Sequence, residues 1–74
     1  MNPAQLTKMV NDIAMFFEGE SGADKAIAEV ASHMRRFWDP RMRREIVAYF
    51  ATGGEGLSEI ARNAVKELAL AAHS

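Results

Sequence analysis

The chain has 74 residues, of which 49% are hydrophobic and 26% charged, and its formal net charge is −1. This balance is typical of a globular protein rather than a disordered one, and the length allows a single domain, residues 1–74. The sequence contains no cysteine, which excludes disulfides and thiolate metal sites.

No apolar run approaches the roughly 18 residues that a membrane span needs. The first residues also lack the basic-then-apolar order of a secretory signal. We therefore expect a cytoplasmic protein with no membrane partner. A core this small supplies only about 3–5 kcal/mol, so good helix packing, self-association or a partner subunit must add to it.

The first predicted helix covers residues 3–17, because Pro3 suits a first helical position and the apolar residues follow a helical period. We expect Gly19 and the Ser21-Gly22 pair to end it. The apolar stripe consists of Leu6, Met9, Val10, Ile13, Phe16 and Phe17. The opposite, polar face consists of Thr7, Lys8, Asn11 and Asp12. The last two stripe residues are adjacent phenylalanines about 100° apart, so we expect one of them to point toward a partner.

The second and third helices are predicted over residues 22–38 and 40–51. The second ends before Pro40, because a residue that precedes proline is pushed out of the helical region. Asp39 is a good N-cap, and Pro40 fits the first position of the next helix. The chain must therefore bend sharply at Asp39.

The fourth helix is predicted over residues 58–72, after a loop that contains Gly53, Gly54 and Gly56. No segment alternates with the period of a strand. The fold class is therefore all-α, a small bundle of four short helices, or of three if the second and third merge around a kink.

Residues 35–44, which we call the basic corner, concentrate the positive charge of the chain. They include five arginines and one aspartate, a net +4, so that the other residues carry −5. Arginine and tryptophan are enriched among the residues that dominate binding energy at protein interfaces. The sequence therefore predicts a docking surface, with Trp38 shared between that surface and the core. Its residues are Arg35, Arg36, Phe37, Trp38, Arg41, Arg43 and Arg44.

Catalytic and metal sites are not indicated. The two histidines, His33 and His73, are forty residues apart, and neither belongs to an HxxxH or HxxE pattern or has paired carboxylates around it. We read His33 as a surface or boundary residue. The Gly53–Gly56 loop lacks the Gly-Lys-Ser/Thr of a phosphate loop and contains Glu55, so it is read as a cap and turn. We expect a protein that is not an enzyme and that binds no cofactor or metal.

Two other interpretations of the basic corner stay open. The arginines could contact nucleic-acid phosphates while Phe37 or Trp38 stacks on a base. The pI of about 6.1 argues against that alternative, a small nucleic-acid-binding helical protein. The corner could also be a solvated surface with no partner, and the chain in isolation could form a homo-oligomer through its exposed phenylalanines. We favour a protein partner.

The run His33-Met34-Arg35-Arg36-Phe37-Trp38-Asp39-Pro40-Arg41-Met42-Arg43 resembles the hallmark segment of one known family. That family is the small delta subunit of cytosolic NAD-dependent, molybdenum-containing formate dehydrogenases. The resemblance extends to Leu6, Met9, the segment 13–17 and Gly56-Leu57-Ser58, and so spans nearly the whole chain.

The resemblance implies a non-catalytic accessory subunit that stabilises the large molybdenum-containing catalytic subunit or assists its assembly. It also implies that the partner subunits carry the cofactors: molybdopterin, iron–sulfur clusters and flavin. The absence of cysteine in this chain agrees with that division, because such clusters are held by thiolates.

Overall fold

The computed structural model describes residues 2–72, and within them the chain forms four helices and no strand. They are α1 (Pro3–Ser21), α2 (Ala23–Phe37), α3 (Pro40–Ala51) and α4 (Glu59–Ala72). The all-α fold class and the four helices predicted from the sequence are thus confirmed. The predicted range 40–51 matches α3, and the predicted range 58–72 begins one residue before α4.

The prediction was wrong about the end of the first helix and the start of the second. The helix continues through Gly19 to Ser21, rather than ending at residue 17, because Gly19 keeps a negative φ and so stays within the helix. The break comes at Gly22, where φ is 84° and the backbone N–H donates to the carbonyl of Glu18. Gly22 ends α1 and begins α2, so these two helices share a one-residue connection.

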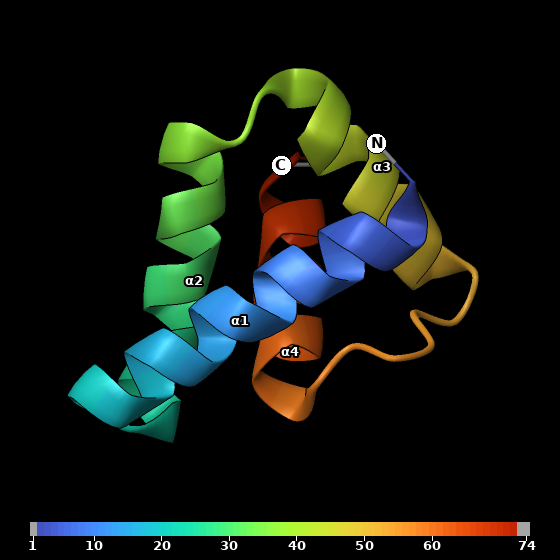
Figure 1. Ribbon diagram of the computed structural model, residues 1–74. Coiled ribbons are helices and arrows are strands. Elements are labelled where there is room, and N and C mark those ends of the chain that lie inside the picture. Colours follow the sequence, from blue (N-terminus) through green and yellow to red (C-terminus); the bar gives the residue numbers. More distant parts are fainter. Residues whose placement is uncertain (1, 73–74) are drawn as a thin grey trace.

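The turn between α2 and α3 follows the capping chemistry of Asp39. The Asp39 carboxylate accepts a hydrogen bond of 2.9 Å from the backbone N–H of Met42, and Pro40 occupies the first position of α3. Trp38 is in extended conformation, so α2 ends at Phe37 rather than at residue 38. In Figure 1 this turn lies at the top of the molecule, above the crossing of α1 over α4.

The four helices surround one apolar core. Helix α1 crosses in front of α4, and each of these two helices contacts all of the other three (Figure 1). Buried side chains from every helix meet there, and the largest that are fully buried are Leu6, Val10, Val30, Met34, Ile46 and Val65. The radius of gyration of 10.9 Å matches the roughly 11 Å expected of a folded chain of this length.

The connection between α3 and α4 is pinned to α1 by Asn11. The Asn11 amide donates to the carbonyl of Gly56 and accepts from the backbone N–H of Ser58, both at 2.9 Å. Thr7, which the sequence placed on the polar face, is buried at 9% exposure near Gly56. The helical period could not reveal this burial, because it comes from a loop 45 or more residues away in sequence.

Candidate functional site

Trp38 anchors the basic corner in the core. Its side chain is only 4% exposed and belongs to the same buried cluster as Met34 and Ile46. From the sequence we expected Trp38 to belong partly to the core and partly to the docking surface. In the structure its side chain is buried in the core. Trp38 therefore anchors the basic corner to the core, and its side chain is not part of the exposed surface of the corner.

Arg43 also has a structural task inside the corner. Its Nη1 donates to the carbonyl of Trp38 at 2.7 Å and to that of Arg35 at 3.1 Å. These carbonyls lie at the C-terminus of α2, where backbone acceptors lack helical partners and a positive charge is favoured by the helix dipole. Arg43 thus holds the end of α2 against the start of α3, and its guanidinium is committed within the chain.

The remaining predicted residues, Arg35, Arg36, Phe37, Arg41 and Arg44, are all exposed. Within residues 2–72, the four arginines make no ion pair or side-chain hydrogen bond. Lys8 shows the contrast, because its amino group lies 2.8 Å from the carboxylate of Asp12. The hydrogen bond to Asp12 and the charge of Asp12 raise the pKa of Lys8 above its ordinary value of 10.5.

Two shallow hollows flank the corner. One is lined by Asp39, Pro40, Arg41 and Arg44 at the start of α3. The other is lined by Arg35, Arg43, Leu68 and Ala71, and so joins the corner to the last turns of α4. Each hollow combines arginine with apolar or aliphatic surface. Carboxylates of a partner protein would find charge and shape there together.

The structure shows a row of four aromatic side chains in contact, which we did not predict from the sequence. Phe16 and Phe17 of α1 and His33 and Phe37 of α2 form a chain of ring contacts, with centroids 5.2, 6.1 and 4.9 Å apart in that order. The spacing of His33 and Phe37, four residues apart on α2, was a usable signal for one of these contacts. The contact between Phe17 and His33 depends on how α1 crosses α2, which the sequence pattern does not specify.

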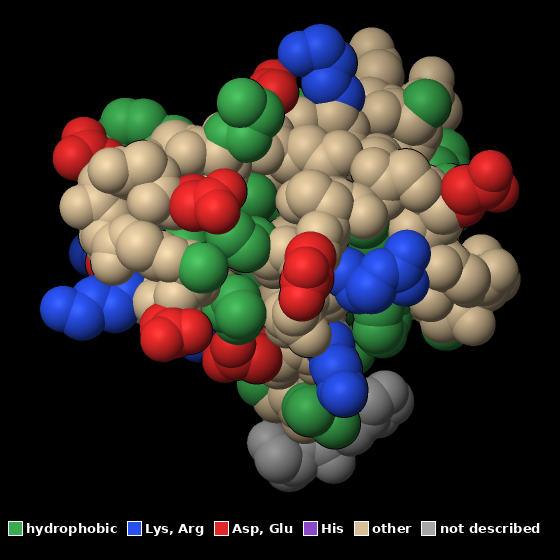
Figure 2. All heavy atoms as spheres, turned by 90° about the horizontal axis from the view of Figure 1, so that it is seen from below, with side chains coloured by type: hydrophobic (Ala, Val, Ile, Leu, Met, Phe, Trp, Pro, Cys, Tyr) green, Lys and Arg blue, Asp and Glu red, His purple; other side chains and the backbone are tan. Residues whose placement is uncertain are grey.

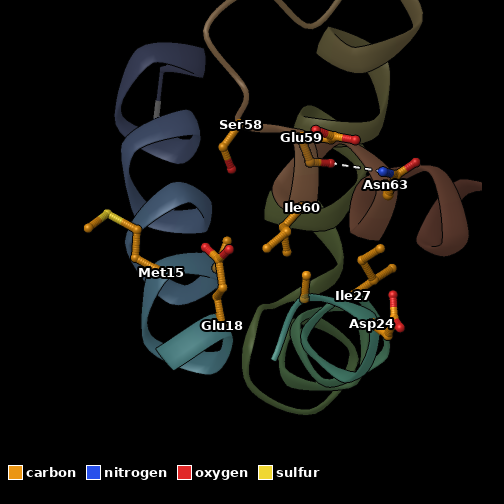
Figure 3. A pocket seen from close by; sticks show the side chains of 10 residues that line it. Met15, Glu18, Asp24, Ile27, Ser58, Glu59, Ile60 and Asn63 are labelled. Atoms are coloured by element: carbon orange, nitrogen blue, oxygen red, sulfur yellow. Dashed lines mark hydrogen bonds between the residues drawn. The ribbon is translucent and has the colours of Figure 1, made fainter. Parts of the chain in front are cut away.

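A groove of about 320 Å³ lies at the opposite end of the molecule, between α1, α2 and the start of α4. Several Asp and Glu side chains surround hydrophobic ones in the left half of that face (Figure 2). In the close view, Ile27 and Ile60 point into the groove, while the carboxylates of Glu18, Asp24 and Glu59 come from three helices and lie apart (Figure 3).

The histidines and carboxylates of the described residues form no metal-binding cluster. Among residues 2–72 no group of three or more His, Asp or Glu side chains could hold a metal ion. His33 is partly buried, as expected for a boundary residue, and its ring lies between Phe17 and Phe37. His73 lies outside the described residues. Over the same range, no helix is both long and apolar enough to cross a membrane.

Fold and surface together define a class: a small all-helical protein whose conspicuous exposed features are a basic corner and an aromatic row. Comparison with family models gives the particular family. The model described as NADH-dependent formate dehydrogenase delta subunit FdsD matches residues 5–65, and the chain belongs to this family. The resemblance that the sequence suggested is thereby confirmed. Searches of curated proteins and of solved structures gave no match.

Proposed function

We propose that this chain is a non-catalytic accessory subunit that binds the large catalytic subunit of a formate dehydrogenase through its basic corner. It would stabilise that subunit or assist its assembly. Membership in the delta-subunit family supports the association with a formate dehydrogenase. The basic corner supports the choice of surface.

The observation that carries the proposal is the set of exposed arginines whose side chains have no ion-pair or hydrogen-bond partner within residues 2–72. Arg41 lies in the first turn of α3, where a positive charge opposes the helix dipole. The position of Arg41 therefore does not stabilise α3, and the net charge of the chain is only −1, so a role other than helix stability is favoured. The corner is also rigid, because Trp38 and Arg43 fix it from within. A rigid charged surface loses little entropy when it binds.

In this proposal the chemistry belongs to the partner subunits. They carry molybdopterin, iron–sulfur clusters and flavin, and this chain binds none of them. The complex would lie in the cytoplasm. The cysteine-free sequence agrees with this division of labour, because it offers no thiolate for a cluster.

The test is co-purification of the co-expressed large subunit with tagged variants of this chain. Arg36→Glu with Arg41→Glu reverses two charges of the corner, and we expect it to abolish co-purification. The matched control is Lys25→Glu with Lys66→Glu, which makes the same change in net charge at two exposed positions outside the corner. Circular dichroism and thermal unfolding would check that both variants keep their helices.

Undiminished co-purification of the Arg36→Glu, Arg41→Glu variant would overturn the corner as the docking surface. Fluorescence anisotropy with labelled DNA and RNA tests the alternative of a nucleic-acid partner. Micromolar binding with a steep salt dependence, lost in the same variant, would favour nucleic acid over the catalytic subunit.

A further inference from the structure

Phe16 and Phe17 of α1 and His33 and Phe37 of α2 form the aromatic row, which crosses the contact between the two helices. Their mutual ring contacts hold the side chains in place. Successive ring planes meet at 75°, 64° and 44°, the edge-on and tilted arrangements that aromatic pairs prefer. Phe17 packs partly on the core and so anchors the row. The one-residue connection at Gly22 holds the two helices together at one end.

The two ends of the row are exposed to an extent that this fold does not require. Phe16 is 60% exposed and Phe37 is 71% exposed, although Leu6 and Val10 on α1 and Val30 and Met34 on α2 are fully buried. Contiguous exposed aromatic surface on a small protein marks a binding site. Because the inner rings are held in place, a partner would order little of this surface on binding.

A hollow of about 170 Å³ opens beside the row, lined by Phe17, Glu29, Ser32, His33, Arg36 and Phe37. It is smaller than the roughly 300–1,000 Å³ of small-molecule pockets, so its size suits a single side chain of a protein. Three of its six lining residues are the aromatic Phe17, His33 and Phe37, which favour a bulky apolar side chain.

The charged residues that line the hollow, Glu29 and Arg36, indicate the charge of the partner segment that carries this apolar side chain. Glu29 already accepts a hydrogen bond of 3.2 Å from the Ser21 hydroxyl. The side chain of Arg36 has no ion-pair or hydrogen-bond partner within residues 2–72. The bond from the neutral hydroxyl leaves the negative charge of Glu29 in place, so the hollow holds one charge of each sign. Of the two, Arg36 is the one without a side-chain partner among the described residues, and a carboxylate of the incoming segment would complement it.

We infer that the aromatic row binds an acidic segment of the partner protein, which inserts one bulky apolar side chain beside Phe37 and places a carboxylate on Arg36. This inference rests on the proposed function, and its partner is the same large catalytic subunit. Arg36 and Phe37 belong to both surfaces, so one partner can cover the corner and the row together.

The test compares two double variants that remove similar exposed apolar groups. Phe16→Ala with Phe37→Ala truncates the ends of the row. Met15→Ala with Leu70→Ala is the control, because those side chains are 71% and 62% exposed and neither belongs to the row. We expect the first variant to weaken binding to the purified large subunit at least about tenfold, as loss of an interface hot spot does, and the control to stay within about twofold.

Three measurements separate the possible failures. If the unaltered chain does not bind the large subunit, the proposed function fails. If it binds and the Arg36→Glu, Arg41→Glu variant does not, but the phenylalanine variant matches its control, only the aromatic-row inference fails. Light scattering that shows a dimer lost in the phenylalanine variant would also overturn the inference, in favour of a second copy.

The acidic character of the segment has its own test. A photo-crosslinking amino acid at position 37 of the co-purified complex should label a segment of net negative charge that contains a bulky apolar residue. Labelling of a neutral or basic segment would contradict the inference.

Discussion

At the scale of single residues, the arginines of the basic corner divide into one that supports the fold and four that face solvent. Arg43 donates to two carbonyls at the end of α2, whereas Arg44 makes no such contact within residues 2–72. We expect Arg43→Ala to lower the free energy of unfolding by about 1–3 kcal/mol, as for hydrogen bonds from charged groups. Arg44→Ala removes the same charge and should change it by less than about 0.5 kcal/mol. Urea denaturation measures both, and equal effects would contradict the assignment.

We expect a substitution of Arg41 to have opposite effects on binding to the partner and on the stability of the fold. It lies in the first turn of α3, which contains no acidic residue to offset its charge. Arg41→Glu should raise the free energy of unfolding by about 0.3–1 kcal/mol, because a negative charge suits the N-terminus of a helix. The same variant should bind the catalytic subunit less tightly if the corner is the docking surface. Thermal unfolding and a pull-down on one preparation would show whether the two effects have opposite signs.

At the scale of elements, we expect alanine substitution to change the stability of the fold in opposite directions at Gly54 and at Gly19. Gly54 follows α3 with φ at +59°, and a Cβ there would lie 3.0 Å from Leu57 and 3.3 Å from Arg62. Gly54→Ala should destabilise the fold by at least about 1–2 kcal/mol, because the left-handed conformation disfavours a side chain. Gly19→Ala, inside α1 with nothing within 4 Å, should stabilise it by about 0.5–1 kcal/mol. Melting temperatures that shift in the same direction would contradict this account.

The same elements show what the sequence could and could not predict. Local signals were sufficient for α3, because Asp39 and Pro40 specify its start and the glycines after Ala51 specify its end. They failed at the end of α1, where the sequence does not distinguish a glycine tolerated in a helix from one that ends it. The corner's charges were visible in the sequence, but the burial of Trp38 and the internal bonds of Arg43 depend on helix packing.

For the whole molecule, charge and apolar surface would contribute differently to the proposed complex. The basic corner carries +4 and the rest of the chain −5, so the corner should be oriented toward an acidic surface before contact. The aromatic row adds apolar area beside it, which salt does not screen. Steering and affinity can therefore be separated by ionic strength.

Raising the salt from about 0.05 M to about 0.5 M shortens the range of electrostatic interactions from more than 10 Å to a few ångströms. The association rate of the unaltered chain with the large subunit should fall about tenfold or more over this range. The Arg36→Glu, Arg41→Glu variant should associate slowly at both salts, whereas the phenylalanine variant should keep the salt dependence and dissociate faster. Stopped-flow or surface-based kinetics can measure these rates. A salt-independent rate for the unaltered chain would show that the basic corner does not face the partner.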